Sequence, residues 1–143
     1  MLFRIADAVR RKLLPNVGRQ GEDLAHRYLR KQKYVIVARN YRPASGAPGE
    51  IDLIVRGGGK LIFVEVKTRS SSDIEFPERA VDAEKQRYVI RTARDYARRA
   101  NVNWDDVRFD IIAITGVKKS RIEHLKDAFG ERSSHELINA RHR

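Results

Sequence analysis

Two carboxylates and a lysine lie on segments of the sequence that otherwise have the composition of buried strands. Asp52 interrupts the apolar run of GEIDLIVR, and Glu65 and Lys67 interrupt that of KLIFVEVKTR. Between the two runs, Gly58 and Gly59 can form the two-residue turn of a β-hairpin, because glycine readily adopts the positive φ angles of such turns. In this register Asp52 faces Glu65 across the strands, on the same face as Lys67.

Two carboxylates that face each other across a strand pair repel, so a compensating positive charge is expected between them. Mg²⁺ binds hard oxygen ligands and completes its octahedron with water and phosphate oxygens. A bound metal ion polarises a phosphate and acidifies a water molecule, and a nearby lysine can orient that water or stabilise the developing charge. The pattern therefore predicts phosphodiester hydrolysis, with Asp52 and Glu65 binding Mg²⁺ or Mn²⁺ and Lys67 assisting.

A simpler explanation is also open, in which the two acids pair with basic neighbours such as Lys67. A register shifted by one residue would then place the acids on opposite faces of the hairpin. In the register that we favour, Glu50 faces Lys67, and we expect these two to pair. The opposite face is then apolar throughout, with Ile51, Leu53, Val55, Ile62, Val64 and Val66.

The elements around the hairpin predict an α/β fold. Apolar residues at helical spacing predict a helix from Gly21 to about Lys33, and a long helix is expected from Pro77 to about Arg99. Strands are predicted at 34–42, 49–56, 60–69 and 107–116, and the type of a last element at 121–129 is left open. The long helix must carry the chain to a strand parallel to the third. We expect a mixed sheet, an antiparallel three-strand meander plus a parallel strand, flanked by helices.

The composition favours one basic domain with a polyanionic partner. The 143 residues support a single core, and 30 Lys and Arg against 19 Asp and Glu give a net charge of +11. DNA is the first candidate partner, an anionic membrane surface is the rival, and a solvated basic surface is the simplest alternative. The chain has no cysteine, which excludes disulfides and thiolate metal sites, and no apolar run long enough to span a membrane. We expect a cytoplasmic protein.

The long helix carries four arginines that recur along one narrow arc, opposite its apolar side. Clustered guanidinium groups suit DNA phosphates, although a solvated helix face explains the spacing equally well. These arginines are Arg87, Arg91, Arg94 and Arg98. Lys85 and Gln86 stand nearer the apolar side of the helix, so either can approach the carboxylates.

With GE opening the first helix, GEIDLI on one strand and FVEVKTR on the next, the sequence resembles the YraN-like family of predicted nucleases. This family belongs to the PD-(D/E)xK superfamily, which includes restriction endonucleases and archaeal Holliday-junction resolvases. The resemblance runs from about Gly18 to Phe129. It implies a restriction-endonuclease-like fold and metal-dependent hydrolysis of DNA, with branched or structured DNA as a candidate substrate. The expected organisation is a basic N-terminal extension at 1–16, a nuclease-like domain at 17–129 and a polar tail at 130–143.

Position by position, the resemblance implies metal-binding acids at Asp52 and Glu65, a catalytic lysine at Lys67 and a catalytic helical glutamate at Glu22. The proline that usually precedes the superfamily's aspartate is absent, because Ile51 stands there. Glu22 also falls at the border of the helix's apolar stripe, from which a side chain can reach over a sheet edge. An acid in the first turn of a helix has a purely electrostatic explanation as well.

Other polar residues are expected outside the site. Asp110 on the strand RFDI is expected to pair with Arg108 or a helix, and His26 and His124, which have no companion at metal-ligand spacing, to have surface or capping roles.

Three functions compete at this stage. The leading one is a metal-dependent endonuclease acting on DNA, and the second is a non-catalytic DNA-binding module on the same fold. The third is an interaction protein held at an anionic membrane by the N-terminal extension. The sequence also permits a homodimer.

Overall fold

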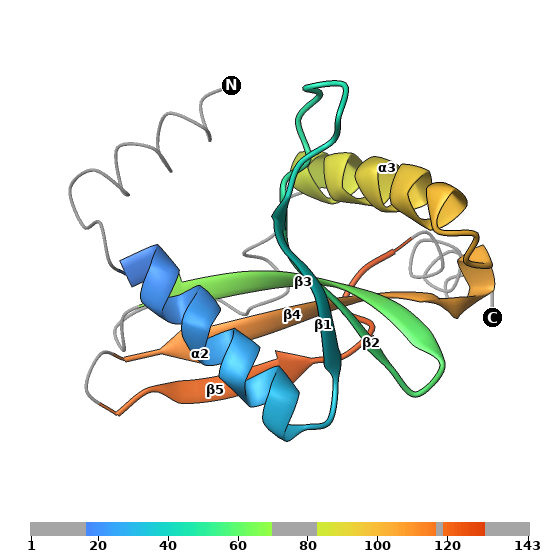
Figure 1. Ribbon diagram of the computed structural model, residues 1–143. Helices are drawn as coiled ribbons and strands as arrows, with labels where there is room; N and C mark the ends of the chain where they lie inside the picture. Colours follow the sequence, from blue (N-terminus) through green and yellow to red (C-terminus); the bar gives the residue numbers. More distant parts are fainter. Residues whose placement is uncertain (1–16, 70–82, 117–118, 131–143) are drawn as a thin grey trace, which may run out of the picture.

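A five-stranded mixed sheet forms the centre of the computed structural model, which describes residues 17–69, 83–116 and 119–130 (Figure 1). The strands lie side by side in chain order, and the first three form an antiparallel meander. The fourth strand is parallel to the third, and the fifth is antiparallel to the fourth. The predicted meander with an added parallel strand is confirmed. The strands are β1 (Val35–Tyr41), β2 (Ile51–Gly57), β3 (Lys60–Arg69), β4 (Val107–Thr115) and β5 (Arg121–Leu125).

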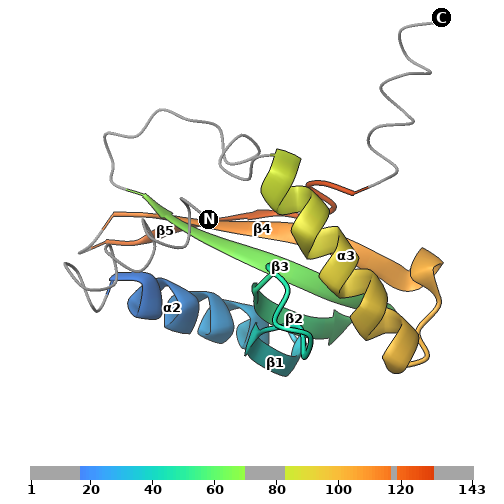
Figure 2. The ribbon, with the colours of Figure 1, turned by 90° about the horizontal axis from the view of Figure 1, so that it is seen from above.

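Two helices cover opposite faces of the sheet, α2 (Val17–Lys31) on one and α3 (Ala83–Arg99) on the other (Figure 2). The alternation of side chains along β3 explains this arrangement. Ile62 and Val64 are buried against the α2 side, whereas Leu61 and Phe63 are buried against the α3 side. A single strand therefore supplies both halves of the core.

The hairpin between β2 and β3 has the predicted register. Gly58 and Gly59 both have positive φ, +58° and +76°, and the strand pairs run from Gly57–Lys60 to Leu53–Val64. The predicted apolar face is wrong at one position, because Ile51 packs with the α3 side of the core instead of with Leu53. The β2–β3 ladder ends at the Leu53–Val64 pair, whereas the pairing of β2 with β1 continues to Tyr41–Ile51, so this end of β2 can twist away from β3.

The connection between β1 and β2 rests on α3. Gly49 has a φ of +135°, a conformation that side chains rarely adopt, and a Cβ atom at this position would collide with Thr92 Oγ1 and the Tyr88 carbonyl oxygen. Arg91 Nη2 also donates a hydrogen bond of 3.4 Å to the carbonyl oxygen of Pro48. This connection, which rises beside the N-terminal part of α3 in Figure 1, therefore brings the start of β2 close to that helix.

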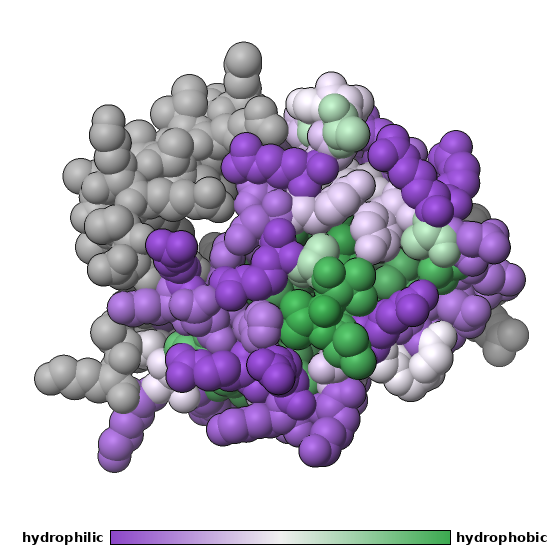
Figure 3. Space-filling view, viewed as in Figure 1, coloured by the Kyte–Doolittle hydropathy of each residue, from purple (hydrophilic) through white to green (hydrophobic). Residues whose placement is uncertain are grey.

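β1 is an edge strand with exposed apolar side chains. Its pairing with β2 shifts register between Ile36 and Ala38, and the intervening Val37 is exposed together with Val35. An apolar patch surrounded by hydrophilic side chains is visible on this side of the molecule (Figure 3). A bulge of this kind interrupts the regular ladder of an edge strand and makes pairing with another strand less favourable.

Several element boundaries differ from those predicted. Helix α2 begins at Val17 instead of Gly21 and ends at Lys31, and Lys33 follows with a left-handed φ of +71°. The predicted element at 121–129, whose type the sequence left open, contains the strand β5, and the short 3₁₀ helix η2 (Trp104–Asp106) precedes β4. The expected N-terminal extension, the start of the long helix at Pro77 and almost all of the C-terminal tail lie outside the described residues. In the part of the chain that the structure covers, neither helix combines the length and apolar character needed to cross a membrane.

Candidate metal centre and basic surface

Asp52 and Glu65 come together where the β2–β3 ladder ends. Beyond the Leu53–Val64 pair, Asp52 Oδ2 accepts a hydrogen bond of 2.8 Å from the backbone N–H of Val66. A side-chain carboxylate thus binds a backbone donor at the point where strand pairing stops. The bond fixes Asp52 beside Glu65, and the charge of Asp52 contributes to the raised pKa of Glu65.

Glu65 is a buried carboxylate with few hydrogen-bond partners. Its side chain is 1% exposed, and Oε1 accepts no hydrogen bond from any residue that the structure describes. Burial, and next the charge of Asp52, raises the pKa of Glu65 to about 8, and burial also raises the pKa of Asp52. The pair therefore retains one proton near neutral pH. A hard divalent cation fits this donor set, because it would supply the coordination that Oε1 lacks.

Lys85 reaches the carboxylates from α3. The sequence indicated that Lys85 or Gln86 could approach them but did not show which. The Nζ atom of Lys85 lies 2.8 Å from Glu65 Oε2. Burial alone would lower the pKa of Lys85, but the charges of Glu65 and Asp52 outweigh it and raise the pKa. The signal in the sequence is helical phase: Lys85 stands four residues before Val89, on the stripe that the helix buries against the sheet.

Lys67 lies on the same side of the sheet, next to Lys85. Burial lowers the pKa of Lys67 first, and the positive charge of Lys85 lowers it further. Glu50, which we expected to pair with Lys67, forms an ion pair with Arg42, whose Nη2 lies 3.1 Å from it. The candidate centre therefore consists of two carboxylates and two lysines, with three members from the hairpin and Lys85 from α3.

Glu22 stands apart from these four residues. Its carboxylate lies 3.8 Å from Arg39 Nη2 on β1, and the same arginine binds Asp23 at 2.8 Å. Its turn of α2 lies against the end of β3, because Gly21 leaves room for Thr68. Within the described ranges, no third acid or histidine joins Asp52 and Glu65 to form a larger metal-binding group. The structure thus places Glu22 beside Arg39, and the carboxylate pair stands without it.

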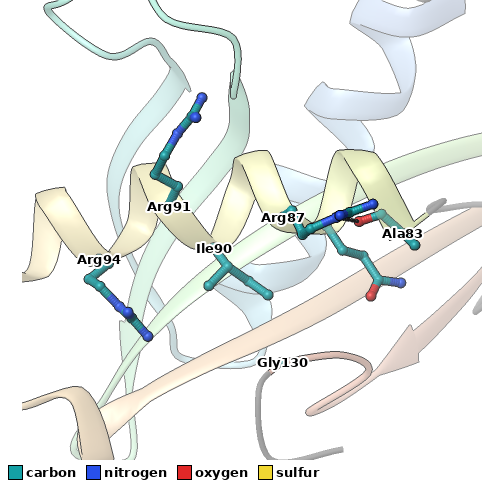
Figure 4. Close-up of a pocket in the computed structure, with 7 residues that line it drawn as sticks. Ala83, Arg87, Ile90, Arg91, Arg94 and Gly130 are labelled. Atoms are coloured by element: carbon teal, nitrogen blue, oxygen red, sulfur yellow. Dashed lines mark hydrogen bonds between the residues drawn. The ribbon is translucent and has the colours of Figure 1, made fainter. Parts of the chain in front are cut away.

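The four arginines of α3, Arg87, Arg91, Arg94 and Arg98, form an exposed stripe, here called the arginine stripe. The residues that α3 buries against the sheet, including Val89 and Ala93, lie on its other side, where Lys85 also points. Part of the stripe lines an open hollow of about 430 Å³, together with Ile90 and Gly130 (Figure 4). The stripe and the candidate centre therefore lie on different sides of one helix.

Aromatic rings support the arginine stripe in two places. The Arg94 guanidinium lies 5.0 Å from the centre of the Trp104 ring, and that of Arg91 lies 5.2 Å from the centre of the Tyr88 ring. Such stacking orients a guanidinium group on the surface of the helix.

Comparison with known proteins assigns a family to this chain. The model of the family described as "Uncharacterised protein family UPF0102" matches residues 21–114. The chain belongs to the UPF0102 family. A UPF0102 protein of Solibacter usitatus is 57% identical over 130 residues, which cover 90% of this chain and 98% of that protein. UPF0102 proteins of Koribacter versatilis and Persephonella marina are 45% and 39% identical, each over 78% of this chain and over 78% and 91% of their own lengths.

The segment matched by the UPF0102 model contains the whole candidate centre and the arginine stripe. It begins at Gly21, beside Glu22, and ends at Ile114, one residue before the end of β4. It therefore includes the hairpin, α3 and the parallel strand, and leaves out β5. The likeness to the UPF0102 proteins shows the family, and its description names no activity.

In this UPF0102 chain the buried acid on β4 belongs to a different network. Arg108 donates two hydrogen bonds of 2.8 Å to Asp110, as predicted, and the backbone N–H of Asp127 donates another of 3.0 Å. The expectation for His124 is wrong, because its side chain is 5% exposed and its Nε2 lies 2.7 Å from Asp110 Oδ2. The hydrogen bonds from His124 and Arg108 outweigh burial and lower the pKa of Asp110. This network joins β4 to β5 on the α2 side, away from Glu65.

Proposed function

We propose that this protein is a metal-dependent nuclease that hydrolyses DNA phosphodiester bonds, with Asp52 and Glu65 binding Mg²⁺ or Mn²⁺. The observation that carries the proposal is the buried carboxylate pair beside two lysines, in which Glu65 Oε1 has no hydrogen-bond donor among the described residues. A protein that only needed a stable core would do better with apolar residues at these positions. The resemblance to the PD-(D/E)xK nucleases supports the same reading.

Asp52 and Lys67 have distinct roles in this proposal. When bound, a divalent ion supplies Lewis acidity to the phosphate and to an attacking water. Asp52 is held in place by the Val66 N–H, so it presents one carboxylate oxygen in a fixed position. Lys67, whose pKa is lowered, is suited to orient the water and to accept its proton, because a base with a pKa closer to neutral exchanges protons more readily.

The arginine stripe supplies the affinity for DNA in this proposal. Contacts with the phosphate backbone hold a duplex in position without reading its sequence, and four exposed arginines on one helix suit this task. Arg87 and Arg91 lie within two turns of Lys85, so DNA along the outer side of α3 can approach the candidate centre at the N-terminal end of the helix. Branched DNA, whose strands diverge around such an edge, is the substrate class that we would test first.

A cleavage panel tests the proposal directly. Linear, flapped and four-way DNA are incubated with the protein and Mg²⁺ or Mn²⁺, with EDTA and the Asp52→Asn variant as controls. We expect cleavage of at least one substrate with either metal and none in either control. Cleavage that persists in the Asp52→Asn variant would exclude the carboxylate pair as its source.

A non-catalytic DNA-binding module is the second candidate function. It is favoured by the observation that the pair Asp52 and Glu65 has no third acidic or histidine ligand within the described ranges. This alternative predicts DNA binding with steep salt dependence but no cleavage of any substrate in the panel.

A further inference from the structure

Lys85 occupies the position next to Glu65 that a cation would take. Its Nζ lies 2.8 Å from Glu65 Oε2, and its charge also acts on Asp52. It approaches from α3, whereas both carboxylates belong to the hairpin. A buried carboxylate needs a compensating charge, and a lysine ammonium group is a compact point charge with three donors. Lys85 therefore already provides part of what a metal ion would provide.

The side chain of Lys85 is also placed so that it can withdraw. It is 34% exposed, although the carboxylate that it contacts is 1% exposed. A lysine can keep its methylene stem against apolar surface and move its ammonium group toward water. Rotation about the bonds of this long side chain moves the ammonium group away from Glu65 without any change in α3.

We propose that Lys85 is an internal counter-ion that balances the remaining negative charge of the carboxylate pair in the metal-free protein and competes with the divalent ion for that pair. Lys85 thereby sets the metal affinity, and it is released from Glu65 when the ion binds. This inference rests on the proposed metal centre and deepens it, because it names the residue that regulates loading of the site. The released ammonium group stays next to the site, where a phosphate oxygen can accept its hydrogen bond.

The charge of the bound cation decides how much its binding gains when Lys85 is removed. Removing Lys85 takes one positive charge away from the pair, which strengthens the binding of any cation there. The gain is larger for a doubly charged ion than for a proton, because the electrostatic energy scales with the charge of the bound species. A variant without the charge should therefore bind the metal more tightly even though it also binds protons more tightly.

The test measures Mn²⁺ binding to the full chain by the electron paramagnetic resonance signal of free Mn²⁺. We expect Lys85→Met and Lys85→Gln to bind Mn²⁺ roughly tenfold or more tightly than the wild type, and Lys85→Arg, which keeps the charge, to stay close to the wild type. Lys60→Met is a matched control. Lys60 is 38% exposed and lies 3.7 Å from Asp106, at the other end of β3, so its loss should leave the affinity unchanged.

The outcomes separate this inference from the proposed function. If the wild type binds Mn²⁺ and the Met and Gln variants bind it equally or more weakly, Lys85 is no competitor and the inference fails alone. A tenfold gain that also appears in Lys85→Arg would replace the charge argument by a steric one. If neither the wild type nor the variants bind Mn²⁺, both the metal centre and the inference fail. If the variants bind more tightly but no DNA is cut, the inference stands and the nuclease proposal fails.

Discussion

Replacing Glu65 with glutamine should stabilise the metal-free protein, and by a margin that grows with pH. The Glu65 carboxyl has a pKa of 4.5 in the unfolded chain, and burial raises this pKa to about 8 in the folded protein. Between these two values the folded state keeps a proton that the unfolded chain releases, so the free energy of unfolding falls as pH rises. Glutamine has nearly the same shape and no titration, so the variant escapes this loss.

The size of the effect follows from the two pKa values. One pKa unit corresponds to about 1.4 kcal/mol. The raised pKa of Glu65 therefore lowers the free energy of unfolding of the wild type by about 3 kcal/mol at pH 7 and by less than about 1 kcal/mol at pH 5. The stability difference between Glu65→Gln and the wild type should therefore increase by about 2 kcal/mol between these conditions. The side chain is 1% exposed, so solvent screening removes little of the effect.

The assay is urea unfolding followed by circular dichroism, in EDTA, at intervals from pH 5 to pH 8. Glu123→Gln is a suitable control, because Glu123 is 56% exposed and pairs with Arg69 at the protein surface. Its stability difference from the wild type should change little over the range. A Glu65→Gln difference that is flat with pH, or that shrinks as pH rises, would refute the assignment of a retained proton to the buried pair.

Further predictions concern metal, DNA, catalysis and the buried network on β4. Mn²⁺ affinity of the wild type, measured by calorimetry, should rise roughly fiftyfold from pH 6 to pH 8, because the proton on Glu65 must leave before the ion binds; a constant affinity would contradict this. Glutamine at all four positions of the arginine stripe should weaken DNA binding and reduce the slope of log affinity against log salt by roughly 3 to 4, whereas an unchanged slope assigns the stripe to solvation. Lys67→Ala should slow cleavage roughly 100-fold or more with DNA affinity nearly intact, and equal cleavage rates would remove its assigned role. Asp110→Asn should destabilise the protein by about 3 kcal/mol in urea unfolding, because it leaves the Arg108 charge without its partner; a loss below about 1 kcal/mol would show that the network contributes little.

The hairpin and its acids could be predicted from the sequence because local rules determine them. The turn at Gly58 and Gly59 and the alternation of side chains fix which residues face each other, and both hold from the Gly57–Lys60 pair to the Leu53–Val64 pair. The predicted pair of Asp52 with Glu65 lies one residue beyond the end of this ladder. Ile51 escaped this reasoning, because its direction depends on where the ladder ends. The sequence carries no local marker of that point.

Partners that are distant in the sequence were harder to find. Helical phase shows that Lys85 faces the sheet, but only the packing of α3 shows that Glu65 is the residue opposite it. His124 becomes a partner of Asp110 because β5 pairs with β4, and a short segment of ambiguous type gave no means of predicting that pairing. The position of Glu22 on its helix was compatible with the site, but the structure places its carboxylate beside Arg39 of β1.

The close contact at Gly49 determines how near the hairpin lies to α3, and therefore how far apart the two sides of the candidate centre are. Asp52 follows Gly49 by three residues, and Lys85 lies on the helix that Gly49 touches at Tyr88 and Thr92. The distance between Asp52 and Lys85 therefore depends on the contact between the Gly49 backbone and α3, although Gly49 takes no part in the chemistry. Any larger residue at position 49 would act as a wedge between hairpin and helix. It would separate the two sides of the centre while leaving each of its charged groups in the chain.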